Sequence, residues 1–198
     1  MSVEDLIREF DVRKDVPIDV NDVKSALIAR GVRDTIWFWA VDIDAEILRG
    51  QLVHWKQKGD PQPAIRGADD YKGVADIYYA ESLTSDWRRL VCCKELLHIL
   101  DPEGALAALP EAITRLTEKI VLPPDLQSSP DDGWATLNDR VAMLKATAIL
   151  FPWRARELIL KDGKLSQSEI AKLMGLPARY VALVMNEVWG EIHDIFVR

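Results

Sequence analysis

The sequence predicts an α+β fold in which a small antiparallel sheet packs on one buried helix and a helical C-terminal region follows. Two observations favour it. Between residues 36 and 80, several short segments alternate apolar and polar residues, which is typical of half-buried strands. After Ser85 the apolar residues recur at helical spacing. The chain has 198 residues, 48% of them apolar, and this suffices for one compact core without disulfides or metal.

Residues 19–30 form the clearest early helix, with Gly31 where a C-terminal cap belongs. Three strands are then predicted, with a turn at Arg49-Gly50 and a loop over 59–73. The strands cover residues 41–47, 51–55 and 75–80.

Ser85 is a good N-cap for an apolar helix over 87–100, which Asp101-Pro102 ends. Further helices are predicted, separated by prolines, glycines and one Pro-rich loop over 122–133. They cover 103–122 (one or two helices), 137–151, 154–160, 166–173 and 177–196.

Charge and composition exclude several classes of protein. The net charge of −7, from 25 basic and 32 acidic residues, disfavours a general polyanion binder. The N-terminus resembles no signal peptide, and no apolar run approaches the ~20 residues of a membrane span. Cys92 and Cys93 are adjacent and are interpreted as small core residues with free thiols. We therefore expect a cytoplasmic protein that binds no membrane.

The segment Lys94-Glu95-Leu96-Leu97-His98 differs at one position from His-Glu-x-x-His. In that motif two histidines one helical turn apart bind Zn²⁺, and the glutamate acts as base on the metal-bound water. A lysine ammonium cannot ligate a cation unless it loses its proton. The alternative is a structural helix in which Glu95 and His98 occur together by chance.

The order of several segments resembles the ImmA/IrrE family of zincin-like metallopeptidases. A strand at 77–79 and a loop with Trp87-Arg88-Arg89 precede the motif helix, as in that family. Residues 146–152 look like its Ala-rich helix ending in proline, and 170–181 look like its closing Ile-Ala segment. The resemblance covers about residues 36–188.

The resemblance implies a domain organisation. N-terminal helices occupy 1–35, a zincin-like core occupies 36–152 with an insertion at about 102–136, and a helical, helix-turn-helix-like segment packs on the core over 153–198.

The resemblance also implies roles for single residues. Glu95 corresponds to the catalytic base and His98 to one zinc ligand, whereas Lys94 replaces the first ligand. The third ligand aligns with Val141, with Asp139 the nearest carboxylate. Two of the three ligands are therefore replaced.

Two arrangements of this site remain open. His98 and Asp139, with His54 from a strand, could rebuild a zinc site. Alternatively, Lys94 supplies the positive charge of the absent metal and pairs with Glu95 or Asp139, since a buried lysine and a buried carboxylate are tolerable only when paired. We expect the second, with no zinc in the isolated protein, and we expect Lys94, Glu95 and His98 to line a cleft beneath the strand around Tyr78.

Three functions follow as hypotheses. The first is a regulatory protein of a prophage, toxin–antitoxin or stress operon that binds a protein partner such as a helix-turn-helix regulator. The second is an active zinc endopeptidase that cleaves a transcriptional repressor. The third is DNA binding through 165–181, in a stretch from Arg154 to Tyr180 with six basic and three acidic residues. Only Arg179 lies where a base-reading side chain belongs, so nucleic acid is the weakest partner. Trp37 and Trp39 either border the cleft or pack in the core.

Overall fold

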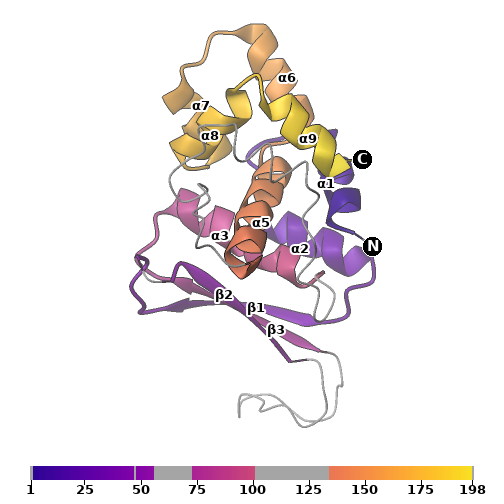
Figure 1. Ribbon diagram of the computed structural model, residues 1–198, viewed down its shortest axis with the longest axis vertical. Coiled ribbons are helices and arrows are strands. Elements are labelled where there is room, and N and C mark those ends of the chain that lie inside the picture. The colour runs from indigo at the N-terminus through magenta and orange to yellow at the C-terminus, as the bar shows by residue number, and fades with distance from the viewer. Residues whose placement is uncertain (1, 47, 56–72, 101–133, 198) are drawn as a thin grey trace.

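The computed structural model describes residues 2–46, 48–55, 73–100 and 134–197, and it is an α+β protein (Figure 1). Three strands form a sheet at one end of the molecule, and the helices gather on one of its faces. The strands are β1 (Thr35–Val41), β2 (Gly50–Trp55) and β3 (Val74–Ala80). The helices are α1 (Val3–Asp11), α2 (Val20–Ala29), α3 (Ser85–His98), α5 (Trp134–Leu150), α6 (Trp153–Asp162), α7 (Gln167–Met174), α8 (Ala178–Met185) and α9 (Trp189–Val197).

The sheet is mixed, which corrects the predicted antiparallel sheet. Its order is β1-β3-β2, with β2 antiparallel to β3 and β1 parallel to β3. Alternation of apolar residues reveals that a segment is a strand, but it does not reveal which neighbour the strand pairs with. Here β3 lies between the two earlier strands, so β1 and β2 occupy opposite edges of the described sheet.

The predicted strand over 41–47 is wrong, although those at 51–55 and 75–80 are confirmed by β2 and β3. The first strand lies earlier, at Thr35–Val41, and the chain turns directly after it. The Asp44 carboxylate accepts a hydrogen bond from the Glu46 amide, and the Asp44 carbonyl accepts one from Leu48. Aspartate stabilises such turns through its own side chain, so the alternation of acidic residues here marks a turn rather than a strand.

The N-terminal helices are capped by local sequence. Ser2 and Asp5 form a reciprocal capping box at the start of α1, and Asp19 caps α2. The predicted glycine cap of α2 is confirmed: Gly31 has φ 103°, its amide donates to Ile28, and the next amide, of Val32, donates to Leu27. This pairing satisfies carbonyls that a helix end leaves open.

Helix α3 is the predicted apolar helix, and it lies between the sheet and α5 (Figure 1). Every residue from Leu90 to Leu97 is buried. The predicted cap is off by one residue, because Thr84 occupies the N-cap position and makes no side-chain cap hydrogen bond. The Arg89 guanidinium ties α3 to other elements, donating to the carbonyls of Met174, Gly175 and Ile18.

The predicted helices over 137–151, 154–160 and 166–173 correspond to α5, α6 and α7. The single helix predicted over 177–196 is wrong, since it divides into α8 and α9. Asn186 has an extended conformation, which ends α8. Its side-chain oxygen accepts a hydrogen bond from the Val188 amide just before α9 begins. The elements predicted at 103–122 and 122–133 lie outside the described residues, as do residues 59–72 of the loop predicted over 59–73.

None of the helices in the described part of the chain is both long and apolar enough to cross a membrane.

Candidate functional site

Helices α3 and α5 bring the charged residues of the motif together. Lys94 and Glu95 lie on α3 with only 7% and 3% of their surface exposed. His98 follows one turn later and is partly exposed. Asp139 comes from α5, which packs against α3. The sequence-predicted residues Lys94, Glu95, His98 and Asp139 therefore meet at one place.

The Lys94 ammonium is the centre of this cluster. Its Nζ lies 2.7 Å from Glu95 Oε1 and 2.5 Å from Asp139 Oδ1. The same Asp139 oxygen lies 3.7 Å from His98 Nε2. Glu95 Oε1 is buried and makes no hydrogen bond of good geometry, so its compensation is the adjacent ammonium. A buried carboxylate in this position requires that charge.

The pKa values of the pair follow from the same contacts. Burial alone would raise the pKa of Asp139, but hydrogen bonding to His98 and the charge of Lys94 outweigh it and hold the pKa at about 2. Burial would lower the pKa of Lys94, yet Glu95 and Asp139 raise it above its ordinary value. Both groups are therefore charged at neutral pH.

Gly50, the first residue of β2, lets the sheet approach this cluster. A Cβ atom at Gly50 would collide with Val91 and would lie 3.2 Å from both Glu95 Oε1 and the Tyr78 carbonyl oxygen. Only a glycine fits so closely between β3 and α3. The sequence reveals Gly50 as a turn residue, but it does not reveal this contact with Glu95.

A cleft of about 310 Å³ opens beside Lys94. Its walls combine apolar side chains with charges of both signs. They are Ala45, Glu46, Leu48, Arg49, Gly50, Val91, Lys94, Asp139, Arg140 and Met143. Of the predicted cleft residues, only Lys94 lines it. The Glu95 carboxylate lies next to Gly50 but does not line the cleft. His98 approaches the cluster at the Asp139 carboxylate and does not line the cleft either. The cleft lies at the start of β2, where Gly50 pairs with Tyr79 and approaches the Tyr78 carbonyl, so it is next to the strand around Tyr78, as predicted.

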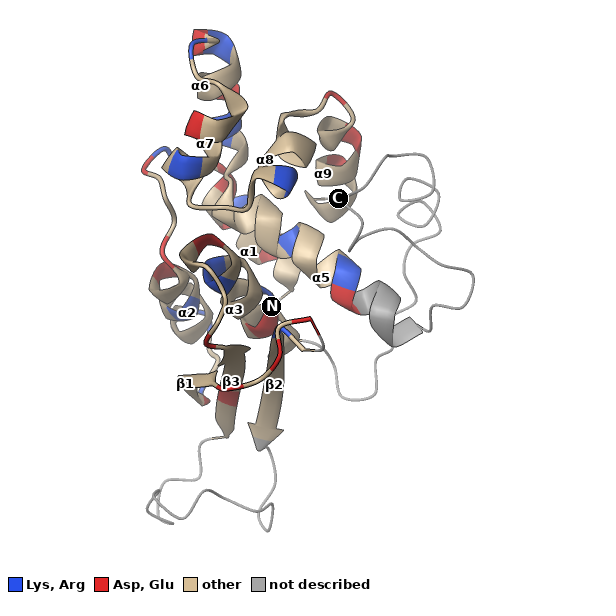
Figure 2. Ribbon diagram, turned by 90° about the vertical axis from the view of Figure 1, so that its left-hand side faces the viewer, with Lys and Arg blue, Asp and Glu red and all other residues tan. Residues whose placement is uncertain are grey.

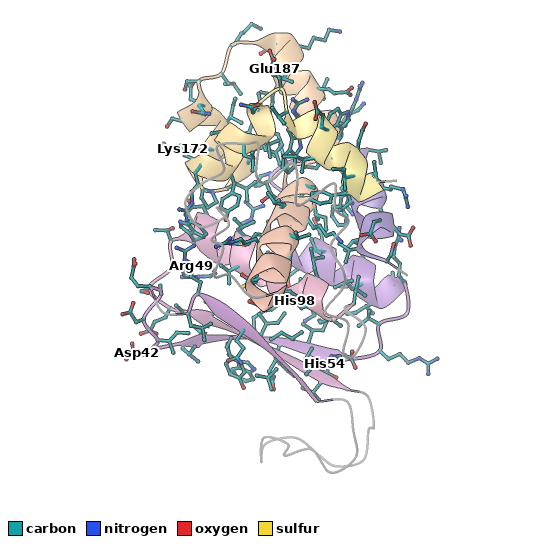
Figure 3. The ribbon with its side chains drawn as sticks, in the orientation of Figure 1. Asp42, Arg49, His54, His98, Lys172 and Glu187 are labelled. Carbon is teal, nitrogen blue, oxygen red and sulfur yellow. The ribbon has the colours of Figure 1, made fainter. Side chains whose placement is uncertain are left out.

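Two side chains from distant segments close around Trp87 near this cleft. The Arg49 guanidinium lies 4.4 Å from the Trp87 ring and that of Arg179 lies 4.1 Å from it. Tyr180 meets the same ring edge-on. Sequence analysis missed Arg49 as a cleft residue, because nothing in the sequence links the turn at 49–50 to the start of α3. Figure 3 shows Arg49 beneath α3 on the side of the sheet where Asp42 lies.

The ligand set of a zinc peptidase does not fit this cluster. A divalent cation beside Asp139 would lie against the Lys94 ammonium, which already occupies the space between the carboxylates. Val141, the aligned third ligand, is 6% exposed in the hydrophobic core, so the residue of α5 that faces α3 is Asp139 instead. Within the described residues no three His, Cys, Asp or Glu side chains are grouped to hold a metal ion.

His54 does not join this cluster. Its Nε2 lies 3.0 Å from Asp34 Oδ2, and Figure 3 shows it at the end of the sheet away from Arg49. A zinc site made from His98, Asp139 and His54 is therefore not assembled in this conformation. Asp101, which follows His98 by about one helical turn, lies outside the described residues.

The remaining sequence-predicted residues lie elsewhere. Trp37 and Trp39 are 46% and 39% exposed, so they neither border the cleft nor pack in the core. Cys92 and Cys93 are buried free thiols, as predicted. Burial raises the pKa of Cys92 to about 12 and that of Cys93 further, so neither is a reactive thiolate at neutral pH.

Comparison with protein-family models, with curated proteins and with solved structures finds no match for this chain. The functional argument therefore depends on the residues and contacts above.

Proposed function

We propose that this chain is an ImmA/IrrE-like protein in which Lys94 has replaced the catalytic metal, and that it acts by binding a protein partner in the cleft beside Lys94. The observation that carries the proposal is the position of the Lys94 ammonium, 2.5 and 2.7 Å from the carboxylates of Asp139 and Glu95. A fixed positive charge there stabilises the carboxylates as a cation would, but it has no open coordination position for water or a peptide carbonyl.

Zinc-dependent peptide hydrolysis requires a free carboxylate as base, and the residue that aligns with that base is not free here. Zinc lowers the pKa of a bound water, and a free carboxylate then removes its proton. Glu95 is the residue that aligns with the base. It is already in an ion pair with Lys94, and only 3% of its surface is exposed. The active-peptidase hypothesis is therefore less well supported than the partner-binding one.

The cleft has the composition of a peptide-binding site. Leu48, which lines it, is 40% exposed, and Val91 and Met143 supply further apolar surface. Arg49 and Glu46 add charges of opposite sign to its walls. Mixed apolar and charged walls favour an extended peptide over a small apolar ligand. A helix-turn-helix regulator is the partner that the family resemblance implies.

DNA binding is the weaker candidate. Helices α7 and α8 contact each other across a turn at 175–177, which is compatible with a helix-turn-helix. However, the guanidinium of Arg179 packs on Trp87 and is not displayed at the surface as a base-reading group would be.

The proposal is tested by mixing the purified chain with a purified helix-turn-helix regulator, the class of partner that the family resemblance implies. Calorimetry measures binding, and mass spectrometry of the mixture, with and without added Zn²⁺, measures cleavage. We expect binding without cleavage. Leu48→Asp places a charge in the cleft and should weaken binding at least about tenfold. Leu173→Asp is the matched control, because Leu173 is also 40% exposed but lies on α7, outside the cleft.

Cleavage that disappears in Glu95→Gln would establish the peptidase instead. Equal weakening by the two leucine variants would show that the cleft is not the binding site, and absence of binding would exclude this regulator as the partner.

A further inference from the structure

Figure 2 shows the helices on one side of the sheet, and the opposite face of the sheet carries two exposed aromatic rings. Trp37 and Trp39 of β1 are 46% and 39% exposed. Their ring centroids lie 6.1 Å apart, and the ring planes differ by 30°. Residues two apart in a strand point to the same face, so the two rings together form one nearly flat surface.

A buried carboxylate holds the Trp39 ring in place. The indole Nε1 of Trp39 donates a hydrogen bond of 2.8 Å to Asp76 Oδ1, and Asp76 is 0% exposed. Asp76 is opposite Trp37 in the strand register, so its side chain belongs to the same face. An indole that donates to a carboxylate becomes more electron-rich, which strengthens the negative potential on the face of its ring. This surface is therefore suited to a cation.

The charge of this face also favours a cation over an anion. Asp76 is the only charged residue that β1, β2 and β3 place on it, as the register of these strands shows. Nucleobases stack on tryptophan as well, but their phosphates need lysine or arginine beside the rings, and these three strands supply neither on this face. The net charge of the chain, −7, disfavours nucleic acid too.

The geometry of the rings selects among cations. A trimethylammonium group is bound best in a cage of rings that surround it. Two rings within 30° of parallel do not surround a group, but a planar guanidinium lies flat on such a surface. The chain makes this contact within its own fold, where the guanidinium carbons of Arg49 and Arg179 lie 4.4 and 4.1 Å from the centroid of the Trp87 ring.

We propose that Trp37 and Trp39 form a binding surface for an arginine side chain of a protein partner, whose guanidinium stacks on the two rings. This surface is separate from the cleft beside Lys94, whose walls include residues of α3 and α5. The two tryptophans make the contact with the partner. Asp76 is a positioning residue, because it is buried and acts through the Trp39 indole.

The test uses the full chain labelled with ¹⁵N, in which the indole N–H signals of Trp37 and Trp39 are assigned from the Trp37→Leu and Trp39→Leu variants. Acetylated and amidated tri-arginine, tri-lysine and tri-citrulline peptides are titrated at about 0.15 M salt, which screens long-range attraction. We expect tri-arginine to shift both indole signals saturably and to bind at least about threefold more tightly than tri-lysine. Tri-citrulline has the planar shape of arginine without its charge and should bind least.

Variants separate the roles of the three residues. Trp37→Leu and Trp39→Leu should each weaken tri-arginine binding at least about threefold. Asp76→Asn keeps an oxygen that accepts from the indole but removes the charge, so it should weaken the binding of tri-arginine and leave that of tri-citrulline unchanged. Ile28→Ala, at an exposed apolar residue of α2, is the control and should change neither. Circular dichroism confirms that every variant is folded.

Four results would overturn the proposal. The first is that tri-arginine shifts neither indole signal at about 10 mM, and the second is that tri-lysine or tri-citrulline binds as tightly as tri-arginine. The third is a thymidine decanucleotide that binds more tightly than tri-arginine, which would assign the surface to nucleic acid. The fourth is a pair of indole signals that shift with protein concentration in the absence of peptide, which would assign it to a second copy of the chain.

Discussion

The Lys94 ammonium is the residue on which the candidate site depends, because it compensates two carboxylates at once. Removing it would leave the Glu95 carboxyl group, which is 3% exposed, without its ion-pair partner. Removing one partner of a buried ion pair lowers the free energy of unfolding by more than the intact pair contributes, because the remaining group is buried without water or a counter-charge.

We therefore predict that Lys94→Met lowers the free energy of unfolding by about 2–4 kcal/mol, measured by urea denaturation. Glu95→Gln in the same chain should restore at least about half of the loss, because it removes the uncompensated charge. Lys145→Met is the control. It breaks an ion pair with Glu4 whose partners are 22% and 33% exposed, and it should cost less than about 1 kcal/mol. Equal losses in Lys94→Met and Lys145→Met would contradict the account.

Asp139 makes the stability of the fold depend on pH in the acid range. Its pKa of about 2 in the folded protein lies below the ordinary 3.8, so its ionised form stabilises the fold above about pH 4. That contribution declines as pH falls from about 4 to about 2. Because the side chain is 52% exposed, water screens the effect, and we expect about 1 kcal/mol or less. Asp139→Asn should be less stable at pH 7 and should lose less stability across this acid range. An identical acid dependence in the two proteins would show that the pairing with Lys94 contributes nothing.

At the scale of elements, the close approach of β2 to α3 depends on Gly50. We predict that Gly50→Ala destabilises the fold by about 1–3 kcal/mol in thermal or urea denaturation, because the new methyl group meets Val91, Glu95 and the Tyr78 carbonyl. Gly190→Ala is the control. Its Cβ would lie 3.8 Å from Trp153, an ordinary contact, and alanine favours the helix α9. A Gly50→Ala variant as stable as wild type would mean that the strand and helix are less tightly packed than described.

The elements also show how far local sequence determines this fold. Capping residues and apolar spacing are local signals, and they predicted α2, α3 and α5–α7 closely. The prediction of a strand over 41–47 was wrong, because alternating acidic residues occur both in half-buried strands and in turns that aspartate stabilises. The division between α8 and α9 was missed because one asparagine, with no proline or glycine, ends the first helix.

At the scale of the whole molecule, pairing between distant segments was the part that sequence could not supply. Sheet order places β3 between β1 and β2, and no residue pattern within a strand specifies its neighbour. The site was predicted better, because Lys94, Glu95 and His98 share one helix. Asp139 was named as the nearest carboxylate, but only the packing of α5 on α3 distinguishes it from Val141.

The central claim is that Lys94 occupies the position of a metal ligand and its cation. If so, Lys94→His should complete a ligand set with His98 and Asp139, which already approach each other to 3.7 Å. Glutamate at Val141 should not contribute, because that position is in the core.

The most direct measurement is the zinc content of the purified wild type, Lys94→His, Lys94→His/Asp139→Asn and His98→Ala proteins after dialysis against Zn²⁺ and buffer. We predict no stoichiometric zinc in wild type, about one zinc per chain in Lys94→His, and loss of that zinc in the double variant. One zinc per wild-type chain that disappears in His98→Ala would contradict the account, as would a folded Lys94→His protein that binds none.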